Sequence, residues 1–198
     1  EGIKCMFTMM NNARLAVGLE GVAIAERAYQ QARDYALERV QSRDASSKSH
    51  DAVTIIHHPD VKRMLLSMKS RTEATRALAY STAATLDTAN RHPDSEKRAS
   101  AQAMLDLLIP VVKAWSTDIG IDVANIGVQV HGGMGYIEET GAAQHLRDAR
   151  IASIYEGTNG IQAIDLVGRK VVRENGETIG TLIADIRRFA PKAANDDL

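Results

Sequence analysis

Residues 9–41 read MMNNARLAVGLEGVAIAERAYQQARDYALERVQ, and this stretch decides the fold class. Its apolar and small side chains recur at spacings of three, four or seven residues, which is the period of one helix face. These positions are Leu15, Leu19, Val22, Ala25, Ala32, Tyr35 and Ala36. The pattern predicts one long helix, and the polar stretch 42–50 that follows predicts a loop.

A second stretch with the helical period spans residues 59–90. Pro59 occupies the place of a first-turn proline, where its missing N–H costs nothing. Apolar and threonine side chains then repeat along one face: Val61, Met64, Leu65, Met68, Thr72, Thr75, Leu78, Ala79, Thr82 and Leu86. We therefore expect a second long helix that packs antiparallel to the first.

A third helical stretch begins after a short break. Asp94 or Ser95 is its expected N-cap. Pro110 predicts either a kink in this helix or the start of a new one. The apolar stripe beyond the proline ends at Gly132-Gly133, where a helix C-terminus is expected.

Shorter helices are predicted in the last third of the chain, at residues 141–150, 159–173 and 178–189. Helices of these lengths can bury their apolar stripes against one another. The sequence therefore predicts an all-α fold, an antiparallel four-helix-type bundle with short additional C-terminal helices. We divide the chain into a bundle domain, residues 1–175, and a helical tail, residues 176–198, that leads to a missing extension.

Composition excludes several classes of protein. The 198 residues are 44% hydrophobic and 25% charged, which is typical of a globular domain. With 24 Lys plus Arg against 25 Asp plus Glu, the charge gives no reason to expect nucleic acid or a membrane surface as a partner. No run approaches the roughly 20 apolar residues that span a bilayer. The single cysteine, Cys5, excludes an internal disulfide framework and fits a cytoplasmic location, and the start at Glu1 indicates a fragment.

A glycine-rich stretch, QVHGGMGY at residues 129–136, is the first candidate for function. Three glycines within four residues require a sharp turn or a close approach of the backbone to another group. One interpretation is purely structural, a helix C-cap with a tight turn. A nucleotide-binding helix start is not expected, because these glycines end a helix instead of following a strand.

Glu156 is the second candidate, because it lies between Ile154-Tyr155 and a Gly-Thr turn that precedes a helix. A poorly hydrated carboxylate in such a place can act as a general base. The alternative is a solvated glutamate near a helix N-terminus, where its charge is favourable. His57 and His58 are adjacent without any carboxylate or thiol at a suitable spacing, so no metal site is expected.

Five separated motifs occur along the chain: NNAR at 11–14, YALER at 35–39, QVHGGMGY at 129–136, RDA at 147–149 and IYEGTNGIQ at 154–162. Together they resemble the carboxy-terminal signature of the acyl-CoA dehydrogenase family, and the similarity extends over residues 9–173. The stretches HPDV at 58–61 and DLVGRK at 165–170 resemble the branch that includes 3-methylmercaptopropionyl-CoA dehydrogenases.

The resemblance implies a reaction and a base. Enzymes of this family oxidise an acyl-CoA thioester to the 2,3-enoyl-CoA: a glutamate takes the α-proton while the β-hydrogen leaves as hydride to the flavin of FAD. Glu156 matches that glutamate, and its backbone N–H is expected to donate to the thioester carbonyl. Arg14, Tyr155 and Gly157 are expected near the substrate, with a surface helix arginine as the alternative for Arg14.

The resemblance also implies cofactor contacts. Arg39 and Gln129 match positions that reach the FAD of a neighbouring subunit, where a guanidinium suits the pyrophosphate. Thr158 matches a position near the same dinucleotide. Gly132 and Gly133 are expected to let the backbone approach it closely.

The expected partners are an acyl-CoA substrate, an electron-transfer flavoprotein or similar acceptor, and further copies of the chain in a homodimer or homotetramer. The amino-terminal helical domain and the central β-domain of the family are absent, so the fragment alone is expected to be inactive. Two alternatives stay open: an acyl-CoA oxidase, and a non-catalytic helical module that only mediates oligomerisation. The chain departs from the family pattern at Ser42-Arg43, in place of Phe-Gly, and at Pro59, in place of a glutamine.

Overall fold

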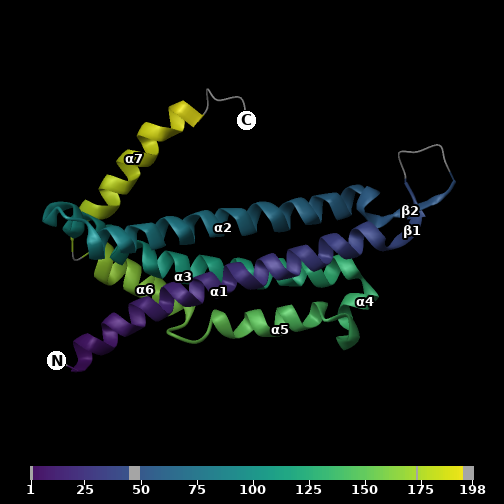
Figure 1. The fold of residues 1–198 in the computed structure, drawn as a ribbon, viewed down its shortest axis with the longest axis horizontal. Coiled ribbons are helices and arrows are strands. Elements are labelled where there is room, and N and C mark those ends of the chain that lie inside the picture. The colour runs from purple at the N-terminus through teal and green to yellow at the C-terminus, as the bar shows by residue number, and fades with distance from the viewer. Residues whose placement is uncertain (1, 45–49, 173, 194–198) are drawn as a thin grey trace.

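Three long helices dominate the computed structural model, which describes residues 2–44, 50–172 and 174–193. They are α1 (Gly2–Glu38), α2 (Pro59–Arg91) and α3 (Ser95–His131), and each runs antiparallel to the one before it (Figure 1). A fourth helix, α5 (Ala142–Ala152), lies against α1 and α3. The predicted all-helical, antiparallel bundle is therefore confirmed in its main elements. The division of the chain at residue 175 stays a prediction.

The helix ends follow the expected capping chemistry. Pro59 is in the first turn of α2. The carboxylate of Asp94 accepts hydrogen bonds from the backbone N–H groups of Glu96, at 2.8 Å, and Lys97, at 3.4 Å, and so caps α3. This helix continues through Pro110 to Gly132, whose φ of 60° ends it. No new helix starts at the proline.

A β-hairpin lies where the sequence predicted the end of a helix and a loop. The first helix ends at Glu38, and strands β1 (Val40–Arg43) and β2 (Ala52–Thr54) pair antiparallel before the turn η1 (Ile55–His57). Both strands are short and largely exposed. Their sequences therefore lack the alternation of apolar and polar residues by which a half-buried strand is recognised. Residues 45–49 of the predicted loop lie outside the described residues.

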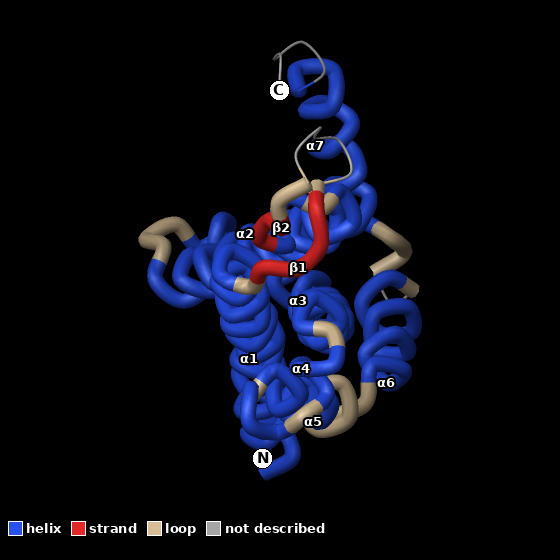
Figure 2. Tube along the Cα trace, turned by 90° about the vertical axis from the view of Figure 1, so that its right-hand side faces the viewer, coloured by secondary structure: helices blue, strands red, loops and turns tan. Residues whose placement is uncertain are grey.

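The remaining elements are short, except the last helix. They are α4 (Gly133–Tyr136), η2 (Glu138–Thr140), α6 (Asn159–Ile164), the π-helical stretch η3 (Asp165–Val171) and α7 (Glu177–Ala193). The predicted glycine-rich loop thus contains one helical turn, and the helix predicted for residues 159–173 changes to π-helix halfway. Both Figure 1 and Figure 2, which looks along the bundle from the hairpin end, show α7 extending away from the long helices.

The core forms where small side chains of α1 face larger ones of α2 and α3. Its main cluster consists of Ala25, Ala28, Ala32, Ala36, Ile55, Met64, Leu65, Met68, Val123, Ala124, Val130 and Ala149. The buried threonines of α2 are satisfied within their own helix: Oγ1 of Thr72 donates to the Met68 oxygen, and Oγ1 of Thr82 to the Leu78 oxygen, both at 2.8 Å. No helix among the described residues is both long and apolar enough to cross a membrane.

Two glycines let α1 and α3 touch through their backbones. A Cβ atom added to Gly21 would lie 2.5 Å from the carbonyl oxygen of Ser116, and one added to Gly120 would lie 2.9 Å from the Gly21 oxygen. Such distances leave no room for a side chain at either position. The axis separation of α1 and α3 is therefore set by this crossing.

We expect Gly21→Ala to destabilise the domain by about 1–3 kcal/mol, because the added methyl group overlaps the α3 backbone. Helix propensity alone favours alanine over glycine by ~1 kcal/mol, so the sign of the change separates packing from propensity. Urea unfolding followed by circular dichroism measures it. Gly180→Ala in α7, where nothing lies within 4 Å of the added atom, is the control and should be neutral or stabilising. Equal effects at both positions would contradict the close crossing.

Candidate functional site

The loop between α5 and α6 has an unusual backbone at two consecutive residues. Glu156 has a φ of 56° and Gly157 has a φ of 87°. Glycine adopts this left-handed region freely, whereas a residue with a Cβ atom loses about 1 kcal/mol there. The conformation of Glu156 must therefore be held by the groups around it.

Three long side chains from three helices donate to the carbonyl oxygens of these two residues. Nε of Arg14, from α1, lies 3.4 Å from the Glu156 oxygen, and Nε2 of Gln162, from α6, lies 3.3 Å from it. The same Nε2 lies 3.0 Å from the Gly157 oxygen, and Nζ of Lys113, from α3, lies 2.9 Å from it. We call Arg14, Lys113 and Gln162 the carbonyl clamp, and all three are buried.

A buried ion pair fixes the first member of the clamp. The guanidinium of Arg14 lies 2.9 Å from the carboxylate of Asp165, and both side chains are 7% exposed. Arg169 adds a longer contact to the other carboxylate oxygen, at 3.7 Å. Arg14 is therefore not a surface arginine, and the first residue of η3 orients it toward the loop of Glu156.

Lys113, the second member, is fully buried although it can carry a charge. Its Nζ donates to Oδ1 of Asn159 at 3.0 Å as well as to the loop. Nδ2 of Asn159 donates back to α3, to the Ala114 oxygen at 3.1 Å and to the Asp118 carboxylate at 2.7 Å. Burial lowers the pKa of Lys113, and attraction by Asp118 and Glu156 opposes this effect. One amine thus ties α3 to the start of α6.

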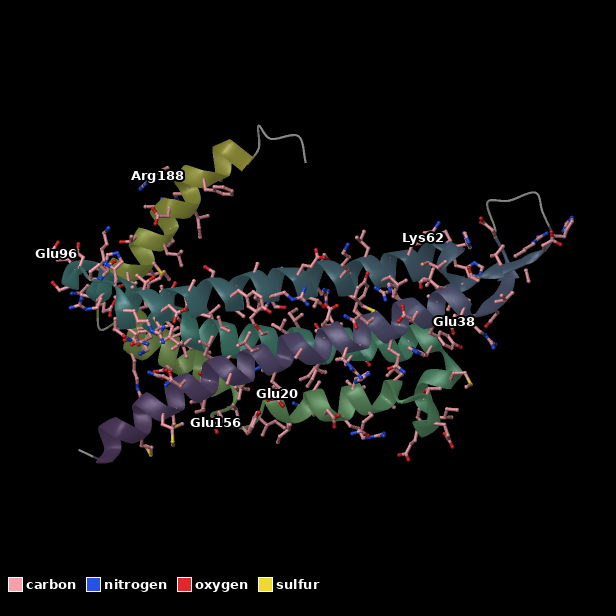
Figure 3. All side chains as sticks on the ribbon, in the orientation of Figure 1. Glu20, Glu38, Lys62, Glu96, Glu156 and Arg188 are labelled. Carbon is pink, nitrogen blue, oxygen red and sulfur yellow. The ribbon has the colours of Figure 1, made fainter. Side chains whose placement is uncertain are left out.

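The functional groups of Glu156 itself are free for a ligand. Its carboxylate is half-buried and makes no hydrogen bond or ion pair with a described residue, and its backbone N–H donates to none of them. The neighbouring Tyr155 donates its hydroxyl hydrogen to Glu20 of α1. This bond raises the pKa of Tyr155 to about 12, so its hydroxyl stays protonated at neutral pH. Figure 3 shows Glu156 and Glu20 on the same side of the bundle.

Gly157 and Thr158 shape the turn into α6. A Cβ atom at Gly157 would lie 3.0 Å from Nε2 of Gln162, in addition to the strain of its positive φ. Thr158 is the N-cap of α6, and its Oγ1 accepts from the backbone N–H of Ile161 at 3.4 Å. These are local structural roles, and the ligand contacts predicted for both residues stay predictions.

The other predicted cofactor residues lie at the hairpin end of the bundle. The side chains of Arg39 and Gln129 are exposed and have no partner among the described residues. Nothing lies within 4 Å of the Cβ positions of Gly132 and Gly133. A cavity of about 410 Å³ beside the hairpin is lined by Tyr35, Arg39, Gln41, Ser42, Ile55, His58, Val61, Val130, His131 and Gly132.

These groups fit the phosphate-bearing part of a dinucleotide. A free guanidinium pairs well with a pyrophosphate, and a free amide can both donate and accept. The rings of Tyr35 and His131 stack with their centroids 4.4 Å apart and give the cavity an aromatic wall. Arg14, which contacts the Glu156 carbonyl, and Glu38, which precedes Arg39, lie 24 residues apart in α1, so this end is roughly 36 Å from the Glu156 loop, at 1.5 Å per residue. One copy of the chain therefore presents two separate groups of candidate residues.

The adjacent histidines have separate environments. Nε2 of His58 lies 2.8 Å from the Gln41 carbonyl oxygen, and His57 is exposed. Within the described ranges, no group of three or more His, Cys, Asp or Glu side chains could hold a metal ion.

Four residues that hold the site together were not predicted from the sequence: Lys113, Asn159, Gln162 and Asp165. Lys113 directly follows the apolar pair Val111-Val112, so the sequence offered a signal that this lysine lies within the apolar stripe. A charged residue in such a place is expected to have a partner. Asn159, Gln162 and Asp165 are polar residues of short helical segments. Their sequence gives no sign that their side chains point toward the bundle.

We expect Asp165→Asn to destabilise the domain by about 3–5 kcal/mol, because it leaves the Arg14 guanidinium buried without a counter-ion. Asp185→Asn is the control, since Asp185 forms an exposed pair with Arg188 at 3.3 Å and its loss should change stability by less than about 0.5 kcal/mol. Denaturant unfolding of the two variants gives the comparison. If the two variants were equally stable, the buried Arg14–Asp165 pair would contribute no more to stability than the exposed pair.

Comparison with known proteins tests the resemblance drawn from the motifs. Residues 1–171 match the family described as acyl-CoA dehydrogenase, C-terminal domain. A 3-methylmercaptopropionyl-CoA dehydrogenase of Ruegeria pomeroyi is 55% identical over 98% of this chain and 32% of its own length. A butyryl-CoA dehydrogenase of Syntrophomonas wolfei is 38% identical over 96% of this chain and 31% of its own length. The chain thus spans about a third of the length of these curated relatives.

The fold agrees with a solved structure of the same family. The butyryl-CoA dehydrogenase of Megasphaera elsdenii matches 84% of this chain and 38% of its own, with a TM-score of 0.67 and 28% sequence identity. The resemblance inferred from five separated motifs is confirmed by the family match, by the relatives and by the arrangement of the helices. The chain belongs to the acyl-CoA dehydrogenase family and corresponds to its C-terminal domain.

Proposed function

We propose that the chain is the C-terminal part of an FAD-dependent enzyme that oxidises an acyl-CoA thioester to the 2,3-enoyl-CoA, with Glu156 as the base. The supporting observation is the state of Glu156 in its loop. The backbone is fixed by the carbonyl clamp, while the carboxylate and the backbone N–H have no partner among the described residues. A base that also presents an N–H can bind a carbonyl and remove the adjacent proton.

Each group of the loop has a defined part in this reaction. The carboxylate of Glu156 takes the α-proton, and its N–H donates to the thioester carbonyl, where negative charge develops. Arg14 lies behind the loop with its positive charge directed at the Glu156 carbonyl, and Tyr155 and Gly157 flank the substrate. When bound, FAD supplies the acceptor for the hydride that leaves the β-carbon.

The hairpin end would contact a different flavin. Arg39 and Gln129, with the open backbone of Gly132 and Gly133, are suited to the pyrophosphate of an FAD bound by a neighbouring subunit. Thr158 is expected near the same dinucleotide, and because it lies in the Glu156 loop and not at the hairpin end, this contact would come from a different copy of the chain than that of Arg39. This arrangement requires a homo-oligomer, and we propose a homodimer or homotetramer.

The substrate and the acceptor are proposed by analogy with the family. The relative of Ruegeria pomeroyi, at 55% identity, favours a short acyl-CoA of the 3-methylmercaptopropionyl type as substrate. We propose an electron-transfer flavoprotein or similar acceptor for the reduced flavin, and a cytoplasmic location, which the single cysteine favours. Oxygen consumption without an added acceptor would instead identify an oxidase. A purely oligomerising module is disfavoured by the burial of Arg14 behind the Glu156 loop.

In the full-length enzyme, Glu156→Gln should lower kcat by about 10²–10⁴-fold, which is the usual contribution of a positioned general base. The amide keeps the size of the side chain, so the bound flavin and the affinity for acyl-CoA should change little. Dye reduction measures turnover, and flavin absorbance measures cofactor content. The exposed Glu177→Gln is the control and should turn over normally. Near-normal turnover of Glu156→Gln would exclude this residue as the base.

Arg39→Ala should weaken FAD binding by about tenfold or more, because a charge-assisted hydrogen bond is worth about 1.5–3 kcal/mol. The loss of flavin on dilution of the full-length protein, followed by fluorescence, measures the effect. Arg63→Ala is the control, since Arg63 is exposed on α2 and, within the described part of the chain, pairs only with Asp60. Unchanged flavin retention in Arg39→Ala would remove this residue from the cofactor site.

A further inference from the structure

Lys113 is a charged side chain with no exposed surface, and the proposed reaction assigns it no role. It lies in α3 among residues that pack into the bundle. Taking an ammonium group out of water is unfavourable, and an apolar side chain of similar volume commonly gives an equally stable or more stable core. Stability alone therefore does not account for a lysine at this position.

The amine of Lys113 joins the two ends of the turn that follows Glu156. Its Nζ donates to the Gly157 carbonyl at 2.9 Å and to Oδ1 of Asn159 at 3.0 Å, on either side of Thr158. Both acceptors are uncharged oxygens. The amine can donate to both of them whether it is protonated or neutral.

The second acceptor, Asn159, is itself held by further hydrogen bonds. Nδ2 of Asn159 donates to the Ala114 oxygen, to Thr117 at 3.0 Å and to Asp118. These partners all belong to α3, the helix that carries Lys113. Lys113 and Asn159 together therefore fix the position of the Gly157 carbonyl relative to α3 through hydrogen bonds.

No other member of the clamp can replace this contact. Of the two carbonyl oxygens, Arg14 reaches only that of Glu156, and Gln162 reaches both through the two N–H bonds of an amide that belongs to α6. The Oε1 of Gln162 is buried and has no hydrogen-bond partner among the residues that the structure describes, which indicates that the amide is oriented for these donations at a cost in free energy. Without Lys113, the Gly157 carbonyl keeps the amide of Gln162 as a donor but loses its direct link to α3.

We propose that Lys113 is a positioning residue for the base: by holding the Gly157 carbonyl and Asn159, it keeps Glu156 in its left-handed conformation and directs both the carboxylate and the N–H at the substrate. The lysine is assigned no contact with substrate or flavin, because its side chain is fully buried within the chain. This inference rests on the proposed function, because it assigns the residue to the same reaction.

The first test replaces Lys113 by Met, of similar length, in the full-length flavoenzyme. We expect kcat to fall about 10-fold to 100-fold, because small misplacements of reacting groups lower rates by such factors. KM should change less than about threefold. Deuterium at the α-carbon of the acyl-CoA should slow Lys113→Met more than the parent enzyme, because proton removal becomes more rate-limiting. Val123→Ala is the matched control: it lies in the same helix, is also fully buried, and should lower stability while kcat and the isotope effect stay unchanged.

A double-mutant cycle separates positioning from independent effects. In a Glu156→Gln background, Lys113→Met should slow flavin reduction by a smaller factor than in the parent enzyme, because the carboxylate is already lost and only the positioning of the backbone N–H remains to be disturbed. Asn159→Ala provides a second variant that leaves the lysine in place. It should lower kcat by about threefold to tenfold, the equivalent of one hydrogen bond, with the same rise in the isotope effect.

The outcomes separate the two proposals. Parental kcat and isotope effect in Asn159→Ala and in folded Lys113→Met, with Glu156→Gln inactive, would overturn the positioning role alone. Near-normal turnover by Glu156→Gln would overturn the base, and with it the function on which this inference depends.

Discussion

Donors from three helices meet at two consecutive carbonyl oxygens, and the shape of the α5–α6 loop depends on this convergence. A glutamate does not favour the left-handed region by its own preference, and the hydrogen bonds from Arg14, Lys113 and Gln162 offset the cost of this conformation. The clamp acts on the backbone and leaves the carboxylate free. In Glu156, the backbone carbonyl is therefore the group that fixes the loop, and the carboxylate is the group that is left for the reaction.

The clamp in turn depends on how closely α1 and α3 approach. A side chain at Gly18 would overlap Val112, the neighbour of Lys113, just as one at Gly21 would overlap the α3 backbone. Glycines on α1 thus bring Arg14 and Lys113 close enough to act on one short loop. The two cations do not require a counter-ion at the loop, because Arg14 has Asp165 and Lys113 has neutral oxygens.

The helices could be predicted from the sequence because their apolar period, the proline at position 59 and the cap at Asp94 are local signals. The hairpin could not, because its strands are short and exposed, and neither could the π-helical half of the segment from Asn159 onward. Family motifs drew attention to Glu156 and Arg14, but the contacts of Lys113 join residues more than forty positions apart. Such contacts depend on the packing of whole helices, which no local pattern encodes.

The distance between the hairpin end and the Glu156 loop has a genetic consequence. Suppose that each active site combines the Glu156 loop of one subunit with the hairpin end of another. A subunit defective only at Glu156 then still has an intact hairpin end for the cofactor, and a subunit defective only at Arg39 still has an intact base. Two such defective alleles expressed together would then rebuild a working centre in mixed oligomers. Heterozygous activity of this kind would exceed that of either allele alone.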